Sequence, residues 1–453
     1  MALKIIVRPT RCRIDPGDAL MDQGRIDEAL DYFHQALKDR PDDPALLRNM
    51  ADALVMKGQY RKALPVYLKA ASISPADQEL HELLASVHDK LGEKEQGRRV
   101  LRAFFRAHPL EVWSEAENAS PTILRISGMD GTICLLGAKR NKRPRAHYRG
   151  GHFTTTHLLP KKSYRVLNWT IAENNINRRD DIPEHVLLLN TIADPDLERR
   201  SLAALSQYLE SRREVPVINP PDRVLETTRD GNDLRLNAIA GVAFPRTVRF
   251  RREGMAPAAV VARIGEMGFD YPIIVRETGT HTGRTVALVH DDAGLTRYFA
   301  KSDGADFYLI QFVDERLDGG RYFGKKRIFC IDGRLYPVVS HIDRVWNVHG
   351  HNRLTVMREN PWMQEQEKRY LADPAGAIGA GNWRILERLP DLVGLDFFGV
   401  DYTVRQDGTL LIYELNASMR HSDSHSRNFP YMQPSIERIT AAFGEMIQRK
   451  IGG

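Results

Sequence analysis

The feature that most constrains the fold is a 34-residue period near the N-terminus of the 453-residue chain. It is marked by a glycine and a proline that recur in three copies, at Gly24, Gly58 and Gly92 and at Pro41, Pro75 and Pro109. Repetition at such a period indicates stacked helical units, because each unit buries its apolar face only against its neighbours. We therefore expect an all-α region at this end of the chain.

The middle copy, GQYRKALPVYLKAASISP, shows how one repeat would fold. Gly58 permits a turn between two helices, the small Ala63 lets them approach, and Tyr67 and Ala70 follow on the same helix face. The pattern resembles the tetratricopeptide repeat, with three copies over residues 10 to 111. The resemblance implies either a groove that docks a protein or peptide partner, or an array that braces a neighbouring domain, and the residues favour neither.

Composition is that of an ordinary globular protein, with 42% hydrophobic and 27% charged residues. No run approaches the ~20 apolar residues of a membrane span, and the first residues do not resemble a secretory signal. Three widely spaced cysteines argue against a disulfide framework and against a cysteine-based metal site. These features predict a cytoplasmic protein without a membrane partner.

The net charge of +6 is modest, but basic residues concentrate in KRNKRPRAHYR, residues 139 to 149. Such a segment could contact nucleic acid or an anionic substrate. A solvated loop is the favoured interpretation, because no nucleic-acid-binding motif accompanies it, and we expect no nucleic-acid partner.

From about residue 121, short apolar runs alternate with helical patterns, which is typical of an α/β domain. Strands are predicted at residues 122–127, 164–171, 185–192 and 215–219. An amphipathic helix is predicted over residues 194–213, acidic at its start and basic at its end. We expect residues 120 to 222 to form a small open-sheet α/β domain, followed by a strand-rich domain over residues 223 to 450.

The strongest chemical signal is GVDYTVRQDGTLLIYELNAS, residues 399 to 418. Asp407-Gly408 between β-prone runs predicts a hairpin with a two-residue loop. That loop places Asp401 directly opposite Glu414, with Asn416 on the same face. Opposed carboxylates destabilise a sheet, so this set calls for a cation, and all-oxygen ligands suit Mg²⁺. The alternative, solvated acids on a surface hairpin, is less favoured because both acids lie within apolar runs.

An aspartate followed thirteen residues later by Glu-x-Asn resembles the metal-binding end of the ATP-grasp superfamily. The resemblance covers roughly residues 220 to 445. It implies an α+β ATP-grasp fold preceded by an α/β pre-ATP-grasp domain, with ATP and Mg²⁺ as cofactors. In that family the glutamate bridges two magnesium ions, while the aspartate and the asparagine hold one each.

The resemblance also implies a nucleotide site upstream. Residues 271–289 predict a strand, a glycine-containing loop whose N–H groups can cover phosphates, and a second strand. Arg276 stands where the family usually has a lysine, and Arg229 and Arg235 lie where a second lysine is usual. Residues 306–315 resemble the hinge that reads adenine and ribose. The implied nucleotide-binding residues are Arg276, Gly279, Thr280, Thr282, Gly283, Gln311, Phe312, Val313, Asp314 and Glu315.

Residues 325–336 predict a second hairpin with an Asp-Gly turn, and Arg327 on its first strand matches an arginine that supports the transferred phosphoryl group in the family. Arg344 is the second candidate catalytic residue. The candidate substrate-binding residues are His341, Asn347 and Arg420.

The implied activity is that of an ATP- and Mg²⁺-dependent ligase that forms carbon–nitrogen bonds. ATP would phosphorylate a carboxylate, and an amine would capture the acyl phosphate, each substrate being a small molecule or a peptide. Two alternatives remain open. One is an ATP-grasp-fold kinase acting on a hydroxyl, and the other is a degenerate scaffold without catalysis.

Overall fold

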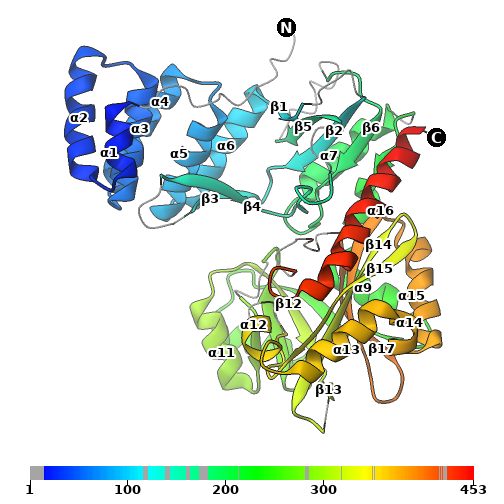
Figure 1. Cartoon of the computed structure of the whole chain (residues 1–453). Helices are drawn as coiled ribbons and strands as arrows, with labels where there is room; N and C mark the ends of the chain where they lie inside the picture. The colour runs from blue at the N-terminus through cyan, green and yellow to red at the C-terminus, as the bar shows by residue number, and fades with distance from the viewer. Residues whose placement is uncertain are drawn as a thin grey trace. The chain divides into compact units, whose positions relative to one another are not determined.

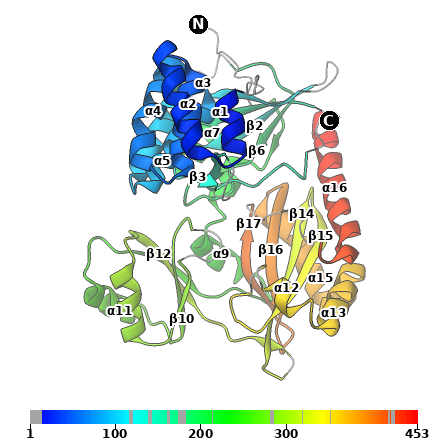
Figure 2. The same ribbon diagram turned by 60° about the vertical axis from the view of Figure 1, so that its left-hand side comes forward.

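The computed structural model describes residues 15–115, 121–137, 143–159, 164–172, 182–212, 214–280, 285–317, 319–348, 350, 352–417, 419, 421 and 426–452. The chain forms two compact units, shown in Figures 1 and 2. The first unit comprises residues 1–151, 161–189 and 198–215, and the second comprises residues 152–160, 190–197 and 216–453. None of the described helices combines the length and the apolar composition needed to cross a membrane.

The first unit begins with six helices in three pairs. They are α1 (Pro16–Asp22), α2 (Ile26–Asp39), α3 (Pro44–Met56), α4 (Tyr60–Ile73), α5 (Gln78–Lys90) and α6 (Lys94–Ala107). Gly24, Gly58 and Gly92 stand between the helices of each pair with φ of 77°, 71° and 81°, a conformation that glycine adopts without strain. Asp43 and Asp77 cap the N-termini of α3 and α5 by accepting backbone N–H groups. The prediction of helical repeats is confirmed.

The small residues of the repeats are explained by close helix packing. Ala63, Tyr67 and Ala70 of α4 are fully buried. At Gly97, the equivalent of Ala63 in the third copy, a Cβ atom would lie 2.7 Å from the carbonyl oxygen of Ala85. The two helices of the third pair therefore approach more closely than an alanine would permit.

The α/β part of the first unit carries strands β1 (Leu110–Ser114), β5 (Arg165–Ile171), β2 (Thr122–Gly128) and β6 (Leu187–Asn190), adjacent in that order. β5 pairs with β1 antiparallel and with β2 parallel. Helix α7 (Arg199–Glu210) packs on β2 and β5, where Tyr208 meets the edge of Trp169. A separate antiparallel hairpin is formed by β3 (Ile133–Gly137) and β4 (Arg145–Arg149).

The helix predicted from residue 194 begins only at Arg199. The acidic residues that were assigned to its first turn form a loop instead. The Asp194 Oδ1 atom accepts the N–H groups of Asp196 at 2.8 Å and Leu197 at 3.1 Å, which holds a turn around Pro195.

The second unit contains two antiparallel-rich sheets. The smaller has the order β11 (Ala287–Val289), β10 (Ile273–Glu277), β12 (Asp306–Gln311) and β9 (Thr247–Arg251). The larger has the order β13 (Arg316–Leu317), β14 (Tyr322–Ile331), β16 (Phe397–Val404), β17 (Leu410–Asn416) and β8 (Val242–Ala243), with β15 (Arg334–Asp343) also paired to β14. All strand pairs are antiparallel except β17 with β8.

Helices cover both sheets. Val260 of α10 (Pro257–Gly265) and Phe299 of α11 (Asp292–Lys301) share one apolar core with the smaller sheet. Helices α12 (Arg353–Val356), α13 (Pro361–Ala372), α15 (Ala380–Val393) and α16 (Gln433–Gly452) contact β15. The remaining elements are β7 (Val217–Ile218), α8 (Pro221–Leu225), α9 (Arg229–Leu236), α14 (Pro374–Ile378) and a 3₁₀ turn at Pro430–Met432. The predicted fold class, helical repeats followed by α/β and α+β parts, is confirmed.

Of the two predicted hairpins, β14–β15 has the predicted two-residue loop and β16–β17 does not. Asp332 and Gly333 form the two-residue loop between β14 and β15, with φ of 50° and 76°. Between β16 and β17 the two-residue loop is wrong, because Val404 pairs with Leu410 and the Arg405 N–H donates to the carbonyl of Thr409. An irregularity between Asp401 and Tyr402 restores the register, so the predicted pair Asp401 and Glu414 is confirmed.

Candidate active site

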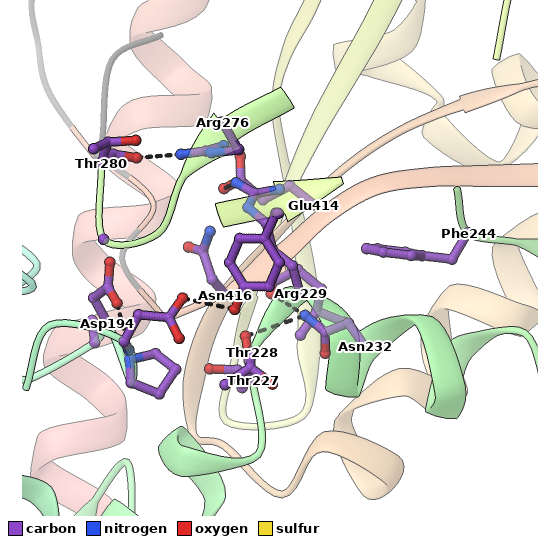
Figure 3. Close-up of a pocket in the computed structure, with 16 residues that line it drawn as sticks. Asp194, Thr227, Thr228, Arg229, Asn232, Phe244, Arg276, Thr280, Glu414 and Asn416 are labelled. Atoms are coloured by element: carbon purple, nitrogen blue, oxygen red, sulfur yellow. Dashed lines mark hydrogen bonds and ion pairs between the residues drawn. The ribbon is translucent and has the colours of Figure 1, made fainter. Parts of the chain in front are cut away.

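A pocket in the second unit gathers charged side chains from four segments (Figure 3). Asp194 comes from the loop after β6, Arg229 from the first turn of α9, and Arg276 from β10. Glu414 and Asn416 come from the end of β17. Strand ends, a loop and a helix N-terminus therefore bring together two guanidinium groups, the three carboxylates of Asp194, Asp196 and Glu414, and the amide of Asn416.

The two arginines give the pocket an anion-binding character. Arg276 is largely buried and donates from Nη2 to the carbonyl of Thr280, while its buried Nε has no hydrogen-bond partner among the described residues. Burial, and secondarily the nearby Arg229, lower the pKa of Arg276 to about 10, so it remains charged at neutral pH. A charged guanidinium with an unused buried N–H favours an incoming anion.

Arg229 is placed by the start of α9. The Thr228 hydroxyl accepts the N–H of Gly231 at 3.2 Å and so caps the helix. The next residue, Arg229, donates from Nη2 to Glu414 Oε1. Arg235, the other arginine considered for this role, instead contacts Glu226 and does not line the pocket. Of the two, the structure brings only Arg229 to the pocket.

Asp401 lies behind the pocket and is 1% exposed. Arg327, its neighbour on β14, binds it through Nε to Oδ1 at 2.6 Å and Nη2 to Oδ2 at 2.8 Å, and Lys325 Nζ lies 3.0 Å from Oδ2. Burial alone would raise the pKa of Asp401, but the two cations outweigh it and hold the pKa well below its usual value. Arg327, which is half-buried, and the buried Asp401 thus form one ionic unit.

The three predicted metal ligands fit a hard cation by their chemistry, since two carboxylates and an amide oxygen on adjacent strands are ligands that Mg²⁺ accepts. Glu414 and Asn416 line the pocket, whereas Asp401 does not. Within the described part of the chain, no three His, Cys, Asp or Glu side chains cluster closely enough to hold a metal. A cation here would need Asn416 and ligand oxygens to complete its coordination.

The predicted adenine and ribose hinge lies apart from this pocket. Gln311 braces a neighbouring turn, donating to Asp270 O at 2.7 Å and accepting the Asp270 N–H at 3.2 Å. Asp314 pairs with Arg316. Glu315 is buried and accepts from the Gln406 N–H and from Arg405. Phe312 packs edge-on against Trp346, and Val313, like these residues, does not line the pocket.

The other predicted residues divide into those that line the pocket, those that lie elsewhere and those outside the described part of the chain. Gly279 and Thr280 line it, but Thr282, Gly283 and Arg420 fall outside the described residues. Arg344 is exposed just after β15. His341 is buried on β15 opposite Lys325, and Asn347 is half-buried in the following loop.

Sequence reasoning missed several pocket residues, among them Asp194, Asp196 and Tyr308. Asp196 belongs to a network in which the Tyr308 hydroxyl donates to Asp196 Oδ2 at 2.8 Å and Arg249 donates to Asp196 Oδ1. The available signal was the Asp-Pro-Asp that directly follows a buried strand. These three residues were instead assigned to the start of the predicted helix, because acidic residues also favour the first turn of a helix.

Comparison with known proteins identifies the repeats. Residues 20–87 match the family model of the tetratricopeptide repeat. A TPR repeat-containing thioredoxin from Arabidopsis thaliana is 34% identical over 85 residues, which are 19% of this chain. The chain spans 12% of the length of that relative.

Similar solved structures include D-alanine–D-alanine ligase from Bacillus anthracis, with a TM-score of 0.39 and 11% identity over 71% of this chain and 99% of the ligase. D-alanyl-alanine synthetase A from Vibrio cholerae has a TM-score of 0.42 and 10% identity, over 74% and 100% of the two chains. N5-carboxyaminoimidazole ribonucleotide synthetase from Thermotoga maritima has a TM-score of 0.37 and 10% identity, over 70% and 75%. Likeness at this level assigns neither an activity nor a substrate to this chain.

Proposed function

We propose that the second unit binds ATP with Mg²⁺ and uses it to activate a carboxylate for attack by an amine, forming a carbon–nitrogen bond. The observation that carries the proposal is the meeting of Arg229, Arg276, Glu414 and Asn416 in one pocket. Guanidinium groups match phosphate oxygens, and carboxylate and amide oxygens match a magnesium ion that also takes phosphate oxygens.

Each residue has a role that follows from its position. Arg276, with its unused Nε, would hold a phosphate next to the glycine-containing loop. Glu414, Asn416 and Asp401 would hold Mg²⁺, which supplies charge neutralisation for the transferred phosphoryl group. Arg229 and Arg327, when released from the two carboxylates, become available to phosphate oxygens. Catalysis of this kind is mainly positioning and electrostatics.

The predicted hinge residues Gln311 to Glu315 remain candidates for adenine and ribose, although Asp314 and Glu315 are ion-paired with arginines. The candidate substrate residues His341, Asn347 and Arg420 and the candidate catalytic Arg344 likewise remain proposals. Carboxylate and amine substrates would be small molecules or peptides.

One observation favours a second candidate, a nucleotide-binding or scaffolding module without catalysis. Asp401 and Glu414 are both neutralised by cations of the chain itself, Asp401 by Arg327 and Lys325 and Glu414 by Arg229. Such pairs could replace a metal permanently. A hydroxyl kinase has no observation of its own in its favour.

Equilibrium binding separates these possibilities. We expect MgATP to bind the whole protein and Mg²⁺ to strengthen ATP binding at least tenfold. A screen of carboxylates and amines should then release ADP only when both are present. ATP binding that is indifferent to Mg²⁺, without ADP release, would instead support the module without catalysis.

A further inference from the structure

The repeats of the first unit carry a hairpin of the same chain against their helices. β3 and β4 both contact α5, and β3 also contacts α6 (Figure 1). Leu136 of β3 and Ala146 of β4 pack on the apolar core of the repeats. Cys134 joins Leu101 and Phe105 in a second apolar cluster. The hairpin therefore covers apolar surface at the end of the helical array.

Polar contacts fasten the hairpin at two distant points of the array. Arg143, two residues before β4, places Nη1 at 2.9 Å from Asp18 Oδ1 and Nε at 3.1 Å from Asp22 Oδ1, both on α1. At the other point the Tyr148 hydroxyl donates to Glu82 Oε1 of α5 at 2.7 Å. The same segment thus reaches the first helix of the first pair and the first helix of the third pair.

At each of the two points the contact includes a largely buried side chain, although Asp22 and Tyr148 are exposed. The side chains of Arg143 and Asp18 are 15% and 11% exposed. Glu82 is buried and also accepts from Gln78 Nε2 at 2.8 Å. Ion pairs and hydrogen bonds of this kind are stronger determinants of geometry than exposed pairs, because breaking one leaves a buried group without its partner.

Stacked helical repeats present an extended concave surface to a ligand. In this chain, acidic residues of α1 and α5 face the basic segment RPRAHYR, residues 143–149, which has complementary charge. We propose that the β3–β4 hairpin is the resident ligand of the repeats. The hairpin occupies the surface of the repeats between α1 and α5. The repeats therefore brace the first unit. A peptide from another molecule reaches that surface only by displacing the hairpin.

The inference rests on the first unit alone and stands whether or not the second unit is a ligase. It also gives a role to one member of the basic concentration in the sequence, Arg143, which meets Asp18 and Asp22 of the same chain.

A charge-reversal cycle in the whole protein tests the proposal. Arg143→Glu and Asp18→Arg should each lower the unfolding temperature of the first unit by about 2–4 °C, as expected for a domain of this size. The double variant should recover at least half of the loss. Arg145→Glu is the matched control, because Arg145 lies two residues further along the chain and is exposed at the start of β4, and it should leave the unfolding temperature unchanged.

The hydrogen-exchange rates of the hairpin amides distinguish local release of the hairpin from a general loss of stability. Amides of residues 143–149 should exchange at least tenfold faster in Arg143→Glu than in the wild type and in Arg145→Glu, and should slow again in the double variant. Equal exchange of this segment in the wild type and in Arg143→Glu would overturn the proposal, as would strictly additive losses in the double variant.

Discussion

Asp401 and Glu414 lie directly opposite each other on β16 and β17, yet each is bound by cations of different elements. Asp401 is held by Arg327 and Lys325 of β14, and Glu414 by Arg229 of α9. Burial and the nearby Asp401 favour the protonated form of Glu414, but Arg229, Arg276 and Lys325 together outweigh them, and the pKa lies below its usual value. Two like charges are thereby kept ionised side by side, which is the state that a cation-binding site requires.

Replacement of Glu414 tests the proposed metal site. Glu414→Gln keeps the shape of the side chain and removes its charge, so Mg²⁺-dependent nucleotide turnover should fall at least 10²-fold while the unfolding temperature changes little. The matched control is Glu266→Gln, an exposed glutamate at the end of α10, which should keep full turnover. Undiminished turnover in Glu414→Gln would contradict the metal assignment.

The ion pair of Asp401 predicts a pH dependence of stability. Its pKa is lowered in the folded protein, so the stabilisation is complete above the unfolded value of 3.8 and is lost as pH falls through the folded value. Asp401→Asn leaves Arg327 and Lys325, each 25% exposed, without a charge partner and should cost up to about 3–5 kcal/mol at neutral pH. Denaturant titrations of both proteins should converge as pH falls below about 4, and a difference that stays constant down to pH 2 would argue against the pairing.

The register of the β16–β17 hairpin shows which part of the candidate site could be predicted from the sequence. The pair Asp401–Glu414 was predicted from a two-residue loop that does not exist. The true loop is one residue longer, and an irregularity beside Asp401 compensates for it. A bulge of this kind has no sequence signal of its own, because it depends on how neighbouring strands pack.

The residues of the pocket show more clearly what the sequence alone could not predict. Glu414 was found from the Asp407-Gly408 turn signal, and Arg276 from the resemblance of its strand and the following loop to the ATP-grasp family. Asp194 and Tyr308 were not, because they reach the pocket through tertiary folding that local patterns do not encode. The hinge residues Asp314 and Glu315 were predicted at the end of a strand, but that strand ends at Gln311 and both lie in the loop beyond it, where their arginine partners could not be predicted.

Arg276 offers a test of phosphate binding that is separate from the metal. Arg276→Ala removes the buried guanidinium and should weaken ATP binding at least tenfold, whereas Arg276→Lys, which keeps the charge, should weaken it less. Arg251→Ala serves as a control, since Arg251 is exposed on β9, pairs with Asp306 and does not line the pocket. Isothermal titration with MgATP measures all three, and unchanged affinity in Arg276→Ala would remove Arg276 from the nucleotide site.

Removal of the repeats distinguishes bracing from recruitment. A chain that begins near residue 115 would expose Met129, Cys134 and Ala172, which pack against Leu101 and Phe105 of α6. We expect such a chain to aggregate or to unfold at a lower temperature. Light scattering and calorimetry measure this. A soluble shortened chain of unchanged stability that loses efficiency only on its natural substrate would show recruitment instead.

The most decisive prediction concerns the reaction class. In an acyl-phosphate route a carboxylate oxygen attacks the γ-phosphorus, ADP leaves, and the amine then displaces phosphate at the acyl carbon. One carboxylate oxygen therefore ends in the released phosphate. Once a carboxylate and an amine that together release ADP are known, the carboxylate is supplied with heavy oxygen and the phosphate is weighed by mass spectrometry.

Labelled phosphate together with ADP is the result that the proposal predicts, because Arg276 and the proposed metal ligands Glu414 and Asn416 line one pocket. An adenylating enzyme would place the label in AMP and release pyrophosphate. A hydroxyl kinase would give a stable phosphorylated product and no labelled phosphate. Product formation with unlabelled phosphate, or with AMP as the main nucleotide product, would refute the ligase proposal even if Glu414 and Arg276 prove essential for nucleotide binding.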